Sequence, residues 1–382
     1  SATLIISKEM RGLILCTAAA SVLLGACTKD IDYNLKDIKP QLIVNSQMTV
    51  GDTLHLVYLA VSKSDRVERI KSGSVKCYVN GVLVADGKLD NRDDDLFIKE
   101  DLHIYGYYYR DEHHKDVYTA GPNAAGKTNQ TRYSFKAGFK PGDVVRIEAE
   151  ADDGAYKAYS EVVVPKAPEF SITDTLLQKN QYGDNSYRIR VKGKDITGED
   201  NFYRILSGRS VIDKKIRYAS ERGEAMTWEE TKDYSFISLD KGNDPILNDG
   251  APVEDIDLAG ASENTFRVFS DRQFSDGTFN IGFNVNANEI IYGLHGLLNF
   301  NRMESETTLS VTIRGITKDE YYYLKALSIY DYLDGDTTLT EPVSFPDNVE
   351  GGIGLVSIST ESVASIKFKR TYNVPSSWIY TE

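Results

Sequence analysis

Cys27 is the residue whose neighbours define its chemistry most clearly. It closes the tetrapeptide Leu24-Gly25-Ala26-Cys27, which ends an apolar run over residues 12–26 that basic residues precede. This is the layout of a secretory signal peptide, and the run is too short to span a bilayer comfortably. Small residues before a cysteine resemble the bacterial lipobox, in which the thiol takes the lipid. We therefore expect residues 1–27 to be a lipoprotein signal peptide with Cys27 as the lipidated residue.

The polar residues directly after Cys27 suggest a second signal. Lys29, Asp30 and Asp32 form a short lysine-plus-acid stretch that resembles the signals sending Bacteroidota lipoproteins to the outer face of the outer membrane. The alternative is that the stretch is only part of a polar tether. In either case we expect a tether over residues 28–39. We predict a protein that is lipid-anchored in the outer membrane and faces the cell exterior.

A long acidic, tyrosine-rich insertion over residues 90–131 holds the candidate binding residues, which are Tyr108, His113 and His114. Tyrosine offers a rigid apolar face with a polar tip, which suits a platform for a sugar or a protein. The alternative is that alternation buries the neighbouring tyrosines and leaves Tyr108 merely exposed. Adjacent histidines on a strand point to opposite faces and cannot chelate one ion without a loop, so we expect no metal here.

The three cysteines cannot form a disulfide within the mature chain. Cys16 leaves with the signal peptide and Cys27 carries the lipid, so that Cys77 has no partner. Cys77 alternates with polar residues in step with Val75 and Val79, so the three side chains should share one face of a strand. We expect it to be a buried structural thiol rather than a nucleophile.

Motifs for catalysis or phosphate binding are not found. The sequence has no Gly-x-Ser-x-Gly phrase of a serine hydrolase. Gly351-Gly352-Ile353-Gly354 lacks the lysine and the glycine spacing of a phosphate loop, so we expect these glycines to permit close backbone packing or a bulge. The spacing of Asp240, Asp244 and Asp249 misses the EF-hand pattern, and we expect a solvated turn there, with an irregular calcium loop as the alternative. We predict no catalytic residues and no cofactor.

Composition narrows the classes of partner. The chain has 382 residues, with 44 Lys and Arg against 57 Asp and Glu, which gives a formal net charge of −13. This acidic balance disfavours nucleic-acid binding, because binding to phosphates needs a basic surface. The length predicts two or three domains.

Alternation of apolar and polar residues dominates from residue 40 onward and predicts a mainly β fold. In residues 143–151 the apolar side chains share one face and the charged ones the other, as a half-buried strand requires. Asp153-Gly154 and Asn80-Gly81 follow such segments and favour hairpin turns, because both residues tolerate positive φ. Short alternating strands with such turns indicate antiparallel sandwiches.

Prolines place a domain boundary near residue 165, because Pro165 and Pro168 cannot donate to a strand ladder. We expect an antiparallel sandwich over residues 40–165 and a second β-rich domain over residues 166–382. The second domain should carry one helix near residues 317–332, which opens on a capping box and continues with apolar residues at helical spacing.

Five segments resemble the Bacteroidota lipoprotein family catalogued as domain of unknown function 4249. The segments are Pro40–Asn45, Asp200–Arg204, Val268–Phe274, Tyr321–Leu324, and Glu341-Pro342 followed by Asn348–Gly354. The resemblance covers nearly the whole mature chain. It implies a surface lipoprotein with an immunoglobulin-like first domain, commonly associated with TonB-dependent outer-membrane transporters. It implies no catalytic residues.

The expected function is therefore non-catalytic. We expect an accessory or ligand-delivery subunit of a TonB-dependent β-barrel transporter, held by its lipid anchor and able to take a glycan or peptide ligand. One alternative is an adhesin or extracellular-matrix component. The other is a surface glycan hydrolase, because the carboxylate pairs of glycosidases leave no spacing signature when the fold sets their separation.

Overall fold

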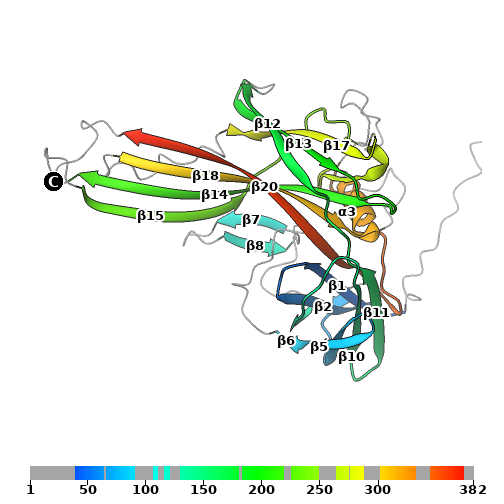
Figure 1. Ribbon diagram of the computed structural model, residues 1–382. Helices are drawn as coiled ribbons and strands as arrows, with labels where there is room; N and C mark the ends of the chain where they lie inside the picture. Colours follow the sequence, from blue (N-terminus) through cyan, green and yellow to red (C-terminus); the bar gives the residue numbers. More distant parts are fainter. Residues whose placement is uncertain are drawn as a thin grey trace, which may run out of the picture. The chain divides into compact units, whose positions relative to one another are not determined.

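The computed structural model describes most of the chain from residue 39 onward (Figure 1). The described residues are 39–63, 66–90, 106–110, 116–120, 130–179, 183–218, 225–248, 264–274, 276–287, 302–332 and 345–373. Within them the fold is mainly β, with antiparallel sheets in sandwich-like layers and one α-helix. The predicted fold class is confirmed.

The first hydrophobic core lies between two sheets formed largely by the first part of the chain. One holds β1, β2, β3, β6 and β9, and the other has the strand order β11-β10-β4-β5. The bounds are β1 Gln41–Thr49, β2 Leu54–Ser62, β3 Val67–Glu68, β4 Gly73–Val79, β5 Val82–Asp86, β6 Lys88–Leu89, β9 Thr131–Lys136, β10 Val144–Ala151 and β11 Tyr156–Val163. Val145 and Ile147 are fully buried while Arg146 is half-exposed, so the predicted alternation of β10 is confirmed.

Both predicted hairpin turns are present. β4 and β5 pair across Asn80-Gly81, and β10 and β11 pair across the turn that contains Asp153-Gly154. All four residues have positive φ, between 51° and 82°. This is the left-handed region that glycine, asparagine and aspartate tolerate best, which explains why these residues mark the turns.

The second core lies between a three-stranded sheet of order β12-β13-β17 and the long strands β14, β18 and β20, beside which β15 also runs (Figure 1). The bounds are β12 Phe170–Lys179, β13 Asn185–Lys194, β14 Phe202–Tyr218, β15 Ala225–Phe236, β16 Val268–Ser270, the 3-10 helix η4 Asp271–Gln273, β17 Thr278–Asn286, β18 Arg302–Ile316, β19 Gly352–Ile353 and β20 Val356–Asn373. Ile189 and Val191 of β13 face Ile205 of β14 and Val311 of β18 in this core.

The helix α3 (Lys318–Tyr332) begins where the capping box predicts. The Thr317 hydroxyl accepts the backbone N–H of Glu320 at 3.2 Å, which satisfies one donor of the first turn. Leu324 and Leu327 are fully buried in a third apolar cluster, where Phe202 from β14 also lies. The ring centroids of Phe202 and Tyr321 are 5.0 Å apart. The apolar stripe of α3 thus covers the start of β14.

β20 connects the two cores. Residues 356–359 pair in parallel with β1, and residues 360–373 pair antiparallel with β18. Val356 and Ile358 are part of the first core, whereas Ile366 and Phe368 pack against the second. Strands from both sides of the predicted boundary therefore share one sheet. The position of the boundary near residue 165 stays a prediction.

Candidate functional site

Most of the residues predicted to anchor or bind lie outside the described residues. They are Cys27, Lys29, Asp30, Asp32, His113 and His114. Tyr108 lies in β7 (Gly106–Arg110), which pairs with β8 (Asp116–Ala120) and places Tyr108 opposite Tyr118. The predicted insertion therefore contains a two-stranded hairpin, and the proposed roles of these residues stay predictions.

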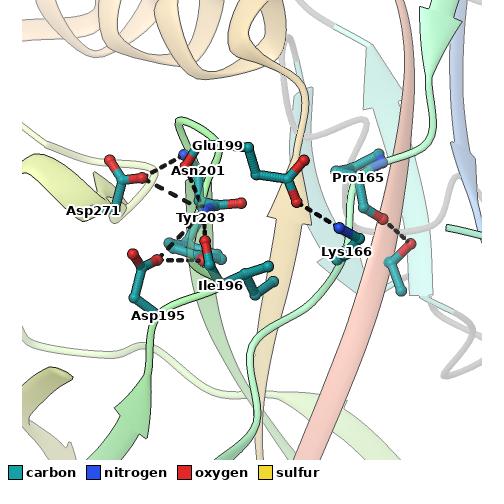
Figure 2. Close-up of polar contacts among 9 residues, drawn as sticks. Pro165, Lys166, Asp195, Ile196, Glu199, Asn201, Tyr203 and Asp271 are labelled. Atoms are coloured by element: carbon teal, nitrogen blue, oxygen red, sulfur yellow. Dashed lines mark hydrogen bonds and ion pairs between the residues drawn. The ribbon is translucent and has the colours of Figure 1, made fainter. Parts of the chain in front are cut away.

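Asn201, which directly precedes β14, is the centre of a polar cluster (Figure 2). Asn201 is buried, with only 8% of its surface exposed. The side-chain amide donates to the carbonyl of Ile196 at 2.7 Å and to that of Glu199 at 2.9 Å. The backbone N–H of Asn201 donates to the Asp271 carboxylate at 2.7 Å, and the N–H of Asp271 donates back to the Asn201 carbonyl at 3.1 Å. These bonds hold the turn before β14 against η4.

Tyr203 completes this cluster from within β14 (Figure 2). Its hydroxyl donates to the Asp195 carboxylate at 3.2 Å, and its ring stacks on Phe274 with the centroids 5.9 Å apart. Burial, and then the nearby Asp195 charge, raise the pKa of Tyr203 well above its usual value. The phenol therefore stays protonated and serves as a hydrogen-bond donor. Asp195 and Asp271 both accept bonds from protein donors, which is the arrangement of a structural cluster.

The glycine-rich phrase 348–354 packs directly against the backbone of β1. A Cβ on Gly352 would collide with the carbonyl oxygen of Leu42, and one on Gly354 with that of Val44. β19 pairs in parallel with β1, and the register of this pairing places Gly352 opposite Leu42. The predicted close backbone packing at these glycines is confirmed. Only glycine lets the two backbones approach this closely.

Two asparagine side chains form hydrogen bonds with the backbone in the same region. The Asn348 side chain donates to the carbonyl of Val356 at 2.8 Å and accepts the N–H of Val356 at 2.9 Å. Asn45 in β1 accepts the N–H of Leu355 at 3.0 Å. The first and last of the family-like segments thus contact each other, because Leu42 pairs with Gly352 and Ile43 with Ile353.

A surface pocket of about 420 Å³ lies over β10 and β11. The Arg146 guanidinium is 3.8 Å from the ring centroid of Tyr159, whose hydroxyl donates to the Glu350 carboxylate. This hydrogen bond is the main reason that the pKa of Tyr159 is raised. Lys157 pairs with Glu150 at 2.9 Å, which lowers the pKa of that carboxyl. The pocket's charges are largely paired with one another, so a charged ligand would have to displace existing bonds.

A larger groove of about 690 Å³ lies between β12 and β20. Phe170–Thr175 and Ala364–Lys367 line it. Within the described part of the chain, β12 has β13 as its only neighbour, and β20 beyond residue 359 has only β18. Both strands are therefore sheet edges at the groove, and such edges carry unpaired backbone N–H and C=O groups. We call this feature the edge groove.

Exposed apolar side chains adjoin the edge groove. Leu176 of β12 is 54% exposed, and Val363 of β20 is 60% exposed. β12 also has a register shift between Ile172 and Asp174 where it pairs with β13. Bulges of this kind re-aim side chains and are frequent at edges. The edge groove therefore has the backbone groups and the apolar contacts needed to receive an extended chain segment.

The described residues include no group of three or more His, Cys, Asp or Glu side chains placed to hold a metal ion. The Asp244 carboxylate accepts the backbone N–H groups of Ile246 and Leu247 at 3.1 Å and that of Gly282 at 2.7 Å. The turn expected at this aspartate is present, but Asp244 is half-buried rather than solvated. Burial raises the pKa of Asp244. Asp249 lies outside the described residues.

Cys77 is fully buried and free, as predicted. Burial raises the pKa of its thiol to about 12, which keeps the thiol protonated at neutral pH.

No helix among the described residues combines the length and the hydropathy needed to cross a bilayer.

Comparison with known proteins gives one family match. The profile described as domain of unknown function (DUF4249) matches residues 28–365. Solved structures that are similar include a DUF4785 family protein from Legionella pneumophila, with 9% identity, a TM-score of 0.21, and coverage of 72% of this chain and 52% of that one. Another is the adhesin InvE of Yersinia pseudotuberculosis, with 10% identity, a TM-score of 0.16, and coverage of 71% and 54%. The chain spans about half the length of these two structures. No curated protein matches it.

Proposed function

The chain belongs to the family of domain of unknown function 4249, and from this premise we propose that it is a non-catalytic lipoprotein of the outer-membrane surface. Its role in this proposal is that of an accessory or ligand-delivery subunit of a TonB-dependent transporter. Cys27 supplies the lipid anchor, and Lys29, Asp30 and Asp32 supply the surface-export signal. A glycan or a peptide is the class of ligand that it would pass to the transporter.

The edge groove is the observation that carries the docking part of the proposal. Two sheet edges that line one groove can bind an extended segment of a partner by adding it as a further strand. Main-chain hydrogen bonds then supply affinity, and the side chains along the groove supply specificity. The groove offers half-buried Ile172 and Ile366 as apolar contacts and exposed Asp174 as a charged one. Lys367, which also lines the groove, is paired with Glu306 at 2.9 Å. A loop of a β-barrel transporter is a partner of suitable form.

The polar clusters support the non-catalytic part. The Asp195 and Asp271 carboxylates accept bonds from Tyr203 and Asn201, and the Tyr159 hydroxyl is bonded to Glu350. Each of these bonds joins neighbouring segments of the chain, which is a structural role.

Affinity purification from gently solubilised membranes tests the proposal. We expect a β-barrel protein to be recovered in stoichiometric amount with the wild-type chain. In the groove variant Thr173→Lys/Ser365→Lys, two exposed edge residues become lysines, which protect an edge against strand addition. This variant should recover far less of the barrel.

The matched control is Ser74→Lys/Val163→Lys, which places the same two charges at exposed strand positions outside the groove. It should recover as much of the barrel as wild type. Equal loss in both variants would refute docking at the groove. If no barrel is recovered with the wild-type chain, the transporter role itself is refuted, and adhesion becomes the better explanation.

A further inference from the structure

One strand of this acidic protein presents a row of positive charges. Four exposed basic residues alternate along β13, and we call them the basic ladder: Arg188, Arg190, Lys192 and Lys194. The residues between them, Ile189 and Val191, are fully buried in the second core. Because side chains alternate across a strand, the four charges share the outer face of the three-stranded sheet. They recur every ~6.6 Å, so the ladder spans ~20 Å.

The neighbouring strand β17 adds amides to this face. Lys192 pairs in register with Asn280, and Arg188 pairs with Asn284. Between them, Arg190 pairs with Gly282, where the lack of a side chain leaves room beside the arginines. A Cβ at Gly282 would lie 3.5 Å from an Nη atom of Arg188 and 3.9 Å from Cγ of Arg190.

The charges of the ladder are not neutralised by the rest of the described chain. Among the described residues, no ion pair within 4.0 Å involves any of the four side chains. Three acids are near. Asp174 stands opposite Arg190 on β12, and the Asp240 carboxylate accepts the amide of Asn284, the residue that pairs with Arg188. The Asp244 carboxylate, which interacts electrostatically with Arg188, already accepts three backbone N–H groups. The face therefore keeps a positive excess on a chain whose formal net charge is −13.

We propose that the basic ladder is a binding surface for an anionic polysaccharide. Ammonium and guanidinium groups suit its carboxylate or sulfate groups. The exposed Asn280 amide can both donate to and accept from ring hydroxyls, whereas the Asn284 amide is already bonded to Gln178 and Asp240. The exposed positions of β13 and β17 on this face hold no aromatic side chain. Single-stranded nucleic acid needs aromatic platforms for its bases. Protein interfaces are enriched in arginine, which this face has, but also in aromatic residues, which it lacks, and they are depleted in lysine. The four ladder residues do not line the edge groove, although Asp174 of the groove pairs with Arg190. The proposal does not depend on the transporter role.

Binding of the full chain to immobilised heparin and polygalacturonate tests the proposal, with neutral dextran as the blank. Heparin carries sulfate and carboxylate groups, and polygalacturonate carries carboxylates alone, so the pair separates the two anion types. By analogy with phosphate contacts on DNA, four contacts predict a loss of affinity on the order of 100-fold between 50 and 200 mM salt. The ladder variant Arg188→Gln/Arg190→Gln/Lys192→Gln/Lys194→Gln should lose both the binding and most of this salt dependence.

The matched control removes four other exposed lysines, in Lys71→Gln/Lys88→Gln/Lys136→Gln/Lys140→Gln. It changes the net charge by the same amount and should bind like wild type. Equal losses in the two variants would show an effect of net charge alone and overturn the proposal, as would a wild-type chain that binds neither polymer. Tighter binding to poly-glutamate than to both polysaccharides would assign the surface to an acidic protein instead. The double variant Arg190→Gln/Lys192→Gln should lose an intermediate part of the binding affinity. An unchanged thermal unfolding midpoint of this variant excludes misfolding as the cause of the loss.

Discussion

Replacing Asn201 with alanine should lower the free energy of unfolding by about 3 kcal/mol. The side-chain amide donates two short hydrogen bonds, to the carbonyls of Ile196 and Glu199. Each lost bond removes a contact made by the buried Asn201 amide, at a cost of about 1.5 kcal/mol. Urea unfolding followed by circular dichroism measures the change, which should appear as a lower midpoint at an unchanged slope.

Asn243→Ala is the control, because this asparagine is exposed in a turn. It should change the free energy of unfolding by less than about 0.5 kcal/mol. Asn201→Asp keeps the size of the side chain, but replaces the amide donor by a carboxylate oxygen close to the Asp271 carboxylate. At pH 7 it should destabilise the fold more than Asn201→Ala does. If Asn201→Ala and Asn243→Ala were equally stable, the cluster in Figure 2 would not hold the start of β14.

Three further predictions concern the anchor and the buried thiol. Cys27→Ser should abolish labelling by a fatty-acid probe, because the thiol is the nucleophile that takes the lipid; persistent labelling would contradict the lipobox assignment. Replacing Lys29, Asp30 and Asp32 with alanine should keep the lipid but leave the protein facing the periplasm, so protease treatment of whole cells should spare the variant and digest wild type. Cys77 should not react with a thiol reagent at pH 8 until the chain is unfolded, since burial raises its pKa to about 12; rapid reaction of the folded chain would contradict its burial.

Local patterns in the sequence predict the local elements well. Asn80-Gly81, Asp153-Gly154 and the capping box at Thr317 mark turns and a helix start through the conformations that each residue tolerates, and the structure has all three. The basic ladder was also readable, because Arg188, Arg190, Lys192 and Lys194 recur at every second position. The tyrosines and histidines of the insertion are the more conspicuous binding candidates in the sequence, because their types are common in binding sites.

The edge groove, by contrast, could not be predicted from local patterns. A strand becomes an edge only through what does or does not pair beside it, and β20 loses its second neighbour after residue 359 because β1 pairs with only its first residues. That pairing joins segments about 300 residues apart. In the same way, the resemblance identified the segment Asp200–Arg204, but the bonds from Asn201 to the turn before it depend on the three-dimensional path of the backbone.

The sharing of β20 between the two cores constrains the order in which the chain can fold. Synthesis proceeds from the amino terminus, so β1 and β2 emerge long before residues 345–359, which complete their sheet with β19 and the start of β20. Until then the β1 edge lacks its parallel neighbour, and Val356 and Ile358 are missing from the first core. We expect nascent chains that end before residue 345 to remain sensitive to protease throughout residues 40–165. The early part of the molecule would then become stable only when the last strand arrives, and an unfinished chain would stay loosely folded.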